Sequence, residues 1–510
     1  MSRALVAFVL VAAVFAFGAY IALAYPLNHD VAWLLYVGKQ VLHGVPLYDR
    51  VVEVNPPLII WFSAITVWLA HAFGVWDATL FRVLVLVMIA VSLWLCRRNL
   101  SELPPLAREV ITLLLAYALI AGVGFEFGQR EHIAIVLVLP FLFLTARQLT
   151  AFGALDAGDM AAGVLAGFGF ALKPHFVLVW LLLEAYLLLR RDGRRIALSA
   201  PHIVVASVLL VYAIAVMLFA RAYFPLLALV AAPYNLYVNV DRRLLLRLPA
   251  TVWAFAAIVV SLAVVRSRPW RDLTRVLAIC CGGFLLMVIF QARAWTYHWI
   301  PSSVLAAVLF AIVLLSFIAR AQSERFTPIV AGAFAVILLA ATSRHVADVG
   351  AQYARLQGKA YQLRGMVGVV DQYAKGQTIA ALSSNMQAGF PLVNYKNLTW
   401  GLRFNSLWLL PGVYPPAERT NPPRYHDIAA MGAAERYMFD AVVEDLARSK
   451  PALLVIDTMP PGYVLYGFDY LDYFGRDARF ASFMKSYNEV APVERYRIFV
   501  RAQNPEQSRG

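Results

Sequence analysis

The chain has 510 residues, of which 61% are hydrophobic and only 15% are charged. These proportions exclude an ordinary soluble protein and are typical of a polytopic membrane protein. The formal net charge of +14 is compatible with a nucleic-acid partner. Arginines at helix ends, which set topology and contact anionic lipid headgroups, explain it better. We therefore expect membrane lipids as partners and no nucleic acid.

The composition divides the chain into two parts. Apolar runs long enough to cross a bilayer recur from the N-terminus to about Ala341. After Arg344 the composition is that of a globular domain, with mixed charge and frequent Pro, Asn and Tyr. The sequence therefore predicts a transmembrane domain over residues 1–343 and a soluble domain over residues 344–510.

Cysteine is nearly absent from the chain. Cys96, Cys280 and Cys281 all lie in or beside apolar segments. Three such residues form neither a disulfide framework nor the paired spacing of a zinc site. We expect no disulfide and no metal.

The first apolar segment, residues 4–25, has two interpretations. Arg3 before it and Ala22-Leu23-Ala24 near its end fit a secretory signal peptide with its cleavage site. Its apolar run of 21 residues is long for a signal peptide and matches a bilayer span. We expect an uncleaved first helix.

Ten further segments have the apolar character of transmembrane helices. They are residues 79–96, 109–123, 132–146, 160–172, 176–189, 199–219, 249–265, 273–290, 298–319 and 327–343. The segments 160–172 and 176–189 are short and are joined by Lys173-Pro174-His175. A break of this kind is tolerated at membrane depth where it is buried in protein or lines a cavity.

One more apolar segment, residues 57–73, decides the orientation of all that follow. If it crossed the membrane, the arginine-rich segment 190–195 would face outward, against the positive-inside bias. We therefore predict that 57–73 is a helix lying in the membrane interface, with Pro56-Pro57 at its start. About 11 spans then leave the N-terminus in the cytoplasm and the C-terminal domain outside.

Under this topology the polar residues gather at the outer face. The first outer loop, residues 26–78, contains Asp30, Glu53 and Asn55. Ionisable groups near membrane depth are costly unless they are paired or hydrated, so they are candidate functional residues by default. The other outer loops add Arg130, Glu131, His132, Lys173, His175, Tyr223, Tyr234, Tyr237, Arg242, Arg243, Arg293, Tyr297 and His298.

Several of these candidates also have a structural explanation. His132 or His298 alone is more often a hydrogen-bonding group at a helix end than a catalyst. Arg130 can pair locally with Glu131. Asp30 follows the first span and precedes an amphipathic run, so helix N-capping is its main structural explanation.

Three cations come from three separate loops on one side of the membrane. They are Arg130, Lys173 and Arg293. Arg and Lys are the usual partners of phosphate oxygens. Cations that converge beside an apolar cavity suit a lipid-linked phosphate.

Residues 344–510 have the pattern of a small α/β unit. We predict helices over 347–373, 426–448 and 477–487, and strands over 378–382, 452–457 and 496–500. The segment 389–414 is rich in aromatic and amide side chains, namely Tyr395, Asn397, Trp400, Asn405 and Trp408, with Arg403 among them. Such a segment suits carbohydrate binding, and a packed contact between domains explains it equally well.

The motifs of the first outer loop carry a family resemblance. The acid Asp30 is followed by an amphipathic run, by Gly44-Val45-Pro46-Leu47-Tyr48 and by Asn55-Pro56-Pro57-Leu58, which leads into the interfacial segment. This order resembles the C superfamily (GT-C) of integral-membrane glycosyltransferases, which use polyprenyl-phosphate sugars. The bacterial branches that resemble this chain include the aminoarabinose and mannosyl transferases. The Gly44–Tyr48 motif and Lys173-Pro174 are similar to the polyprenyl-phosphate-mannose-dependent mannosyltransferases. The similarity covers residues 1 to about 320 in layout and only short motifs in sequence.

The chain departs from the family pattern at two positions. Val31 follows the first acid where the family has a second acid, so the resemblance does not imply a metal. Asn55 precedes the two prolines where the family has His or an acid. The second departure leaves the subfamily, and with it the sugar, open.

The resemblance implies a fold, a location and a reaction. The fold is a polytopic α-helical membrane protein of GT-C type with a C-terminal periplasmic α/β domain, in the bacterial inner (plasma) membrane. The reaction is an inverting transfer of a hexosyl or pentosyl unit from a polyprenyl-phosphate sugar donor to a glycan or lipid acceptor of the cell envelope, without a cofactor. Asp30 would be the general base.

The resemblance also implies roles for the other candidates. Glu53, Asn55 and Glu131 would hold the acceptor or orient other groups. The donor phosphate would be bound by Arg130, Lys173, His175, Arg293, Tyr297 and His298, which stabilise the charge that grows on it.

Two other classes of protein remain as alternatives. A transporter or flippase of a lipid-linked saccharide would show internal repeats and polar residues at both faces, whereas this sequence shows no repeat and gathers its polar residues at one face. An O-antigen polymerase or ligase type of enzyme would use lipid diphosphate donors and rely on Arg and His in one large outer loop. The loop 220–248 is long enough to keep this alternative.

Overall fold

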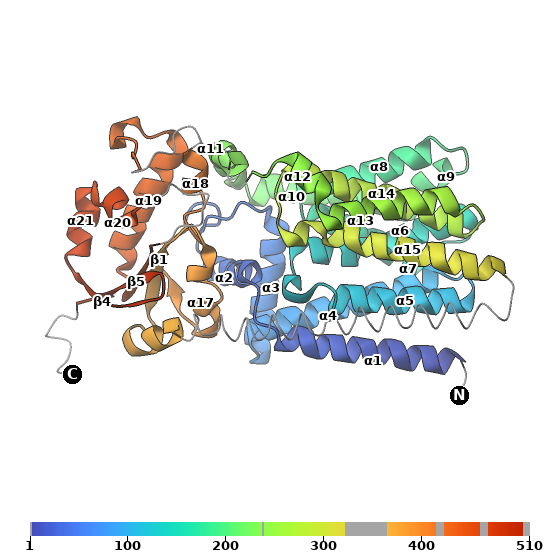
Figure 1. Ribbon diagram of the computed structural model, residues 1–510, viewed down its shortest axis with the longest axis horizontal. Helices are drawn as coiled ribbons and strands as arrows, with labels where there is room; N and C mark the ends of the chain where they lie inside the picture. Colours follow the sequence, from blue (N-terminus) through green and yellow to red (C-terminus); the bar gives the residue numbers. More distant parts are fainter. Residues whose placement is uncertain (1–2, 237–238, 322–364, 415–422, 459–467, 503–510) are drawn as a thin grey trace.

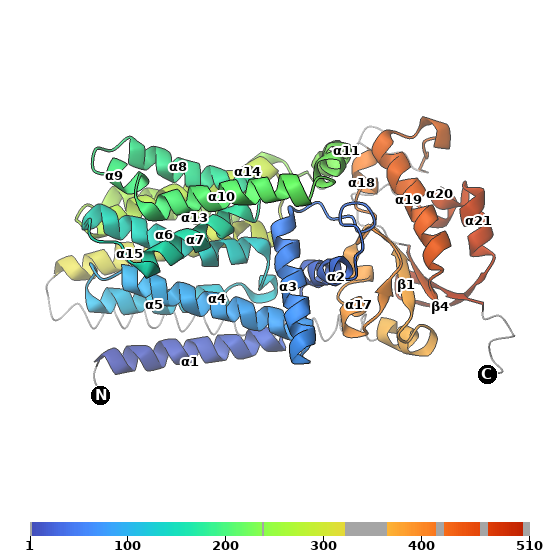
Figure 2. The same ribbon diagram turned by 180° about the vertical axis from the view of Figure 1, so that it is seen from behind.

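The protein consists of a long helical bundle with a smaller sheet domain at one end (Figures 1 and 2). The structure is a computed structural model, and it describes residues 3–236, 239–321, 365–414, 423–458 and 468–502. In this part of the chain five helices are long and apolar enough to cross a membrane, or six if one bent pair counts as a span. The chain is a polytopic α-helical membrane protein, as its composition predicts.

With one exception, the helix of 4 residues over Arg194–Ala197, the helices of the bundle lie where the apolar segments predict them. They are α1 (Arg3–Ala24), α4 (Asp77–Asn99), α5 (Pro105–Ile120), α6 (Arg130–Thr150), α7 (Ala157–Ala171), α8 (Val177–Leu188), α9 (Arg194–Ala197), α10 (Ala200–Phe219), α13 (Pro249–Val264), α14 (Trp270–Gln291) and α15 (Ile300–Ala321). The span predicted over 327–343 and the domain boundary at 343 lie outside the described residues. Helix α6 packs against α4, α7, α14 and α15, and is buried on nearly all sides.

Two helices lie between the bundle and the sheet domain. After α1 the chain turns by 72° into α2 (His29–Leu42). Helix α3 (Pro57–Phe73) runs across the direction of α1 and α4 in both views (Figures 1 and 2). It begins directly after Pro56 and ends at Gly74, whose φ of 64° is left-handed. That α3 lies in the membrane interface stays a prediction.

A buried arginine holds the bend between α1 and α2. Arg82 of α4 donates to the backbone carbonyls of Leu23 and Tyr25 at 3.1 and 2.6 Å. Carbonyls at the end of a helix have no N–H partner within it, so they need one from elsewhere. Asn28 then caps α2 by accepting from the backbone N–H of Asp30 at 2.9 Å. The N-cap of α2 is therefore Asn28, and N-capping does not explain the presence of an acid at Asp30.

The region 221–249 is not the continuous loop that the sequence analysis expected. It contains α11 (Tyr223–Leu236) and α12 (Arg242–Arg247). Helix α11 packs against α18 (Leu410–Val413) and α19 (Ala433–Ser449) of the sheet domain. The apolar run of α11 is short and holds Pro233. Helix α11 is buried by α18 and α19, which are far away in the sequence, so its own sequence pattern did not predict a helix.

The sheet domain contains a five-stranded mixed sheet in the order β2-β1-β3-β5-β4. Strand β1 is parallel to β2 and β3, whereas β5 is antiparallel to β3 and β4. Strand β3 is buried at every position, as its continuous apolar run predicts. The strands are β1 (Thr378–Leu382), β2 (Thr399–Trp400), β3 (Leu453–Asp457), β4 (Tyr487–Val493) and β5 (Tyr496–Arg501).

The helices of this domain differ in part from prediction. Helix α19 begins at Ala433 and not at residue 426, and α21 (Ala478–Met484) ends before Tyr487, which begins β4. Strand β4 and helix α20 (Tyr470–Gly475) were not predicted. Strand β4 is an edge strand with mostly exposed residues, so it has no apolar pattern to detect. Most of the helix predicted over 347–373 lies outside the described residues, and residues 365–373 are helical.

The aromatic segment 389–414 forms a packed contact between the two parts. The Trp400 backbone N–H donates to the Tyr36 hydroxyl of α2 at 2.9 Å. The Leu27 backbone N–H donates to the Tyr395 hydroxyl at 2.7 Å. Of the two explanations offered for this segment, the domain contact holds for Tyr395 and Trp400.

We predict that Arg82→Leu destabilises the protein. The substitution removes the donors for two carbonyls at the α1–α2 bend, so the free energy of unfolding should fall by about 1–3 kcal/mol. Thermal unfolding in lipid nanodiscs measures the change. Arg191→Leu is the matched control, because Arg191 is exposed and makes no hydrogen bond or ion pair with a described residue. Equal melting of the two variants would show that the bend does not depend on Arg82.

Candidate functional site

A pocket of ≈ 460 Å³ lies where the bundle, α2 and the sheet domain meet. This volume is in the range of small-molecule binding sites. Seven of the predicted site residues line it: Asp30, Glu53, Asn55, Arg130, Lys173, Tyr297 and His298. The tertiary structure thus brings together side chains from four separate regions of the sequence.

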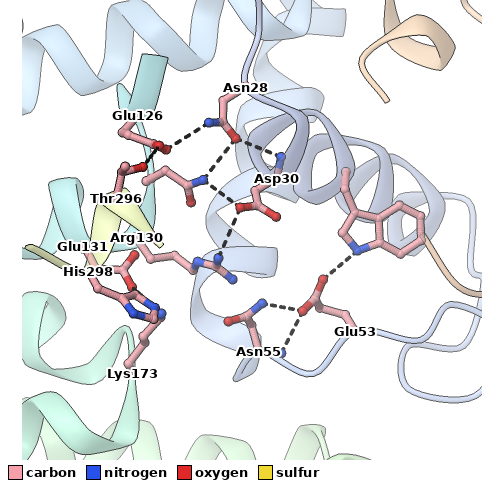
Figure 3. Close-up of polar contacts among 12 residues, drawn as sticks. Asn28, Asp30, Glu53, Asn55, Glu126, Arg130, Glu131, Lys173, Thr296 and His298 are labelled. Carbon is pink, nitrogen blue, oxygen red and sulfur yellow. Dashed lines mark hydrogen bonds and ion pairs between the residues drawn. The ribbon is translucent and has the colours of Figure 1, made fainter. Parts of the chain in front are cut away.

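The centre of the site is an ion pair between α2 and the start of α6. The Arg130 Nη2 lies 3.9 Å from the Asp30 Oδ2, and the two side chains are 7% and 21% exposed. The Gln129 Nε2 donates to the same Oδ2 at 2.8 Å and to the Asn28 Oδ1 at 3.0 Å. Figure 3 shows Arg130 between Asp30 and a second group of polar residues. Both carboxylate contacts use Oδ2, and within the described chain Oδ1 makes no hydrogen bond.

The surroundings of Asp30 favour its ionised form. Burial in itself raises the pKa of the Asp30 carboxyl, but the electrostatic effects of the neighbouring His29 and Arg130 side chains lower it. The hydrogen bond from Gln129 and the charge of Lys173 act in the same direction. The pKa of Asp30 is therefore held below its ordinary value of 3.8, and the carboxylate is able to accept a proton or a hydrogen bond at neutral pH.

Arg130 has hydrogen-bonding capacity left over. It is the first residue of α6, the central helix, and Gln129 at the N-cap position makes no capping hydrogen bond. The guanidinium donates no hydrogen bond to any residue that the structure describes, and its Nε is buried without a partner. A buried guanidinium at the positive end of a helix dipole is suited to bind an anion.

A second cluster surrounds Glu131. The Lys173 Nζ donates to the Glu131 Oε1, and the His298 Nε2 lies 3.8 Å from the same oxygen (Figure 3). Lys173 sits in the break between α7 and α8, and its Nζ lies 5.6 Å from the centre of the Tyr297 ring. Within the break, Lys173 is buried and lines the pocket, whereas Pro174 is exposed. Glu131 itself does not line the pocket and instead orients Lys173 and His298.

Glu53 and Asn55 form a rigid corner of the pocket. The Glu53 Oε2 accepts from the Trp33 Nε1 at 2.6 Å. The Glu53 Oε1 accepts from the backbone N–H of Asn55 at 2.8 Å and from its side-chain amide. The Val52 backbone N–H donates to the Arg403 carbonyl at 2.8 Å, so this loop is fixed to the sheet domain.

Two predicted phosphate ligands do not line the pocket. The Arg293 Nη2 donates to the Tyr234 carbonyl at 2.6 Å, and its guanidinium lies 3.8 Å from the centre of the Tyr234 ring. Arg293 therefore supports the wall behind Tyr234. His175 is half-buried with its ring against Phe176. Sequence position placed both residues near the pocket, but only packing decides which way a side chain points.

Several lining residues were not among the predicted site residues. Glu126 accepts from the Asn28 Nδ2 at 3.2 Å and from the Thr296 hydroxyl, which links the loop before α6 to the start of α2 (Figure 3). The sheet domain contributes six residues: Ser384, Asn385, Met386, Asn405, Ser406 and Trp408. The amide-rich and aromatic character of 389–414 was a signal for Asn405 and Trp408. Nothing in the sequence pointed to residues 384–386.

We predict that Gln129→Leu raises the pKa of Asp30, because it removes a hydrogen bond to the carboxylate. A carboxyl whose pKa is lowered by folding stabilises the protein above its unfolded pKa, and this contribution is lost as the pH falls through the folded value. The infrared band of the protonated carboxyl, taken as wild type minus Asp30→Asn, should appear below pH 3.8. In Gln129→Leu the band should appear at higher pH, and in the control Gln372→Leu, at an exposed position, it should not move. An unchanged band in Gln129→Leu would contradict the assignment.

Comparison with known proteins places this geometry in a known fold. No family model matches the sequence, and no curated protein is significantly similar to it. The crystal structure of ArnT from Cupriavidus metallidurans bound to undecaprenyl phosphate is 15% identical, with a TM-score of 0.56 over 96% of this chain and 97% of that chain.

Two further solved structures have TM-scores below 0.5. The archaeal oligosaccharyltransferase AglB from Archaeoglobus fulgidus, in complex with an inhibitory peptide and a dolichol-phosphate, is 11% identical (TM-score 0.48, 97% of this chain, 74% of that chain). The arabinofuranosyltransferase AftD from mycobacteria is 14% identical (TM-score 0.44, 99% and 40%). The likeness to ArnT extends over both parts of the chain, which therefore has the fold of that membrane protein.

Proposed function

We propose that this protein is an inverting glycosyltransferase that moves a sugar from a polyprenyl-phosphate donor to a glycan or lipid acceptor of the cell envelope. The observation that carries the proposal is the Asp30 carboxylate 3.9 Å from the buried Arg130 guanidinium. Both lie in a pocket at the end of an apolar bundle, with Lys173 on the same wall. A base and two cations beside the membrane are the groups that such a transfer needs.

The donor class follows from the cations and from the membrane. Arg130 keeps free donors, Lys173 is oriented by Glu131, and the start of α6 directs its dipole to the same place. These groups suit a phosphate. A phosphate that is attached to a lipid chain reaches the end of a transmembrane bundle most directly, because its lipid chain lies in the bilayer. The ArnT structure of the same fold holds undecaprenyl phosphate, and we extend this ligand class to the present chain.

The reaction then proceeds by one displacement. The acceptor hydroxyl gives its proton to Asp30, and its oxygen forms a bond to the anomeric carbon. The bond from that carbon to the phosphate oxygen breaks, and the polyprenyl phosphate leaves with the electron pair. Arg130 and Lys173 stabilise the negative charge that grows on the leaving phosphate, an effect that low polarity strengthens. His298 and Tyr297 lie beside this charge.

Asp30 is suited to its role for a geometric reason. The Oδ2 is held by Gln129 and Arg130, which fixes the carboxylate in place. The Oδ1 is left to receive the proton from the acceptor. Glu53 and Asn55 lie apart from the cluster of Glu131, Lys173 and His298 (Figure 3), and we assign them to the part of the wall nearest an approaching acceptor.

We also propose that the pocket faces the periplasm and that the membrane is the bacterial inner membrane. Arg97 and Arg98 end α4, and α9 contains Arg194 and Arg195. Helix α9 lies at the end of the bundle away from the sheet domain (Figure 1). Arg-rich loops favour the cytoplasmic side, so the sheet domain belongs outside.

The first test is turnover of a panel of radiolabelled polyprenyl-phosphate sugars by full-length protein in lipid vesicles with a cell-envelope fraction as acceptor. We expect one of these donors to be consumed, and Asp30→Asn to lower the rate by about 10²–10⁴ without loss of donor binding. Asp472→Asn, an isosteric change at an exposed position of the sheet domain, should be as active as wild type.

The outcomes of this test separate the alternatives. Consumption of a lipid diphosphate saccharide in place of a monophosphate would indicate the polymerase or ligase class. Movement of lipid-linked saccharide across the vesicle without transfer would indicate a flippase. An Asp30→Asn protein as active as wild type would rule out the mechanism.

The orientation has its own test. A reporter fused after Arg98 should be cytoplasmic, and one fused after Gly510 should be periplasmic. Alkaline phosphatase serves as the reporter, since it is active only outside the cytoplasm. The reverse pattern would place the pocket in the cytoplasm and contradict the proposed location.

A further inference from the structure

The pocket has two walls of different chemistry. The ionisable side chains that line it, such as Asp30, Arg130 and Lys173, come from the helical part. The sheet domain contributes residues 384–386 together with Asn405, Ser406 and Trp408. None of these six described residues is ionisable. One wall is therefore charged and the other is neutral, polar and partly aromatic.

The neutral wall consists of side chains held in place by their neighbours. The Ser406 hydroxyl donates to the Asn405 Oδ1 at 3.1 Å, and Asn405 is half-buried. Its side-chain nitrogen makes no hydrogen bond with any described residue, so it is a donor available to the pocket. Trp408 is 8% exposed and packs edge-to-face on Tyr234 at 5.5 Å. Arg293 supports Tyr234 from behind.

The acids of the charged wall are already engaged. Both oxygens of Glu53 accept hydrogen bonds from Trp33 and Asn55. Both oxygens of Glu126 accept from Asn28 and Thr296. Neither acid is therefore left to bind an ammonium group. The remaining acid, Asp30, is paired with Arg130 through its Oδ2, and its Oδ1 receives the proton of the acceptor hydroxyl in the proposed reaction.

The stereochemistry of the proposed reaction places the acceptor. In an inverting displacement the entering and leaving oxygens lie on opposite sides of the anomeric carbon. The leaving phosphate lies at Arg130 and Lys173, at the starts of helices of the bundle. The base Asp30 is on α2, which is packed on the sheet domain through Tyr36 and Trp400. The acceptor therefore approaches from the side of the sheet domain.

We propose that the neutral wall is the acceptor subsite and that it takes an uncharged sugar residue. This inference rests on the proposed function. Asn405 and Ser406 bind hydroxyl groups of the sugar, and the ring of Trp408 packs against its C–H face. A uronic acid or an amino sugar would lose its hydration there without gaining a partner of opposite charge, which disfavours both. The subsite thus selects neutral saccharide acceptors.

Equilibrium binding to the full-length protein in lipid nanodiscs tests the inference. The probes are three alkyl glycosides, used below their micelle concentrations: octyl glucoside, octyl glucuronide and octyl glucosaminide. We expect the neutral glucoside to bind more tightly than either charged probe. Asn405→Ala should weaken the binding of the glucoside about tenfold, as for the loss of one or two hydrogen bonds. Asn488→Ala, at an exposed position of the edge strand β4, should bind it like wild type.

The outcomes distinguish this subsite from the reaction itself. Binding requires no transfer, so a protein that consumes no donor but binds the glucoside through Asn405 would keep the subsite while the proposed reaction fails. Where a donor is consumed, Asn405→Ala should raise the KM for the acceptor and leave the KM for the donor unchanged. Equal or tighter binding of a charged probe, unchanged glucoside binding in Asn405→Ala, or a raised donor KM would each overturn the inference.

Discussion

The structure depends on one electrostatic constraint, namely that a guanidinium buried at the start of the central helix needs an anionic partner. Arg130 begins α6, and Asp30 meets it at 3.9 Å. Asp30 reaches this position only because the chain turns by 72° between α1 and α2. Arg82 fixes the end of α1 and Asn28 fixes the start of α2, so both serve the geometry of the ion pair.

The sheet domain is part of the site and not an appendage. It holds α2 through Tyr36 and Trp400, and it holds the loop of Glu53 through Val52 and Arg403. The Arg403 Nε in turn donates to the buried Asp445 at 3.0 Å. The wall that carries the base and the wall that carries the neutral side chains are therefore linked by hydrogen bonds, one to the Tyr36 hydroxyl and one between backbone groups. This arrangement lets a rigid scaffold position residues that lie on loops.

Hydrophobic periodicity predicted the elements that bury themselves locally and failed for those buried by distant partners. Apolar length located the described bundle helices except the short α9, and the continuous apolar run located β3. Helix α11 was missed because it is buried against α18 and α19 of the sheet domain. Strand β4 was missed because its hydrogen bonds to β5, and not an apolar face, make it a strand. In the candidate site, Asp30, Arg130 and Lys173 were foreseen, and residues 384–386 were not.

The sequence alone determined that the chain is a membrane protein and that its candidate site residues lie near the ends of apolar segments, because the cost of burying charge in lipid leaves few places for them. The tertiary structure decided which of these residues share a pocket. Arg293 donates a hydrogen bond to the Tyr234 carbonyl, and Glu131 accepts one from Lys173. Gln129 donates one to the Asp30 carboxylate. Side-chain direction follows from packing between segments that are up to several hundred residues apart, and no local pattern encodes it.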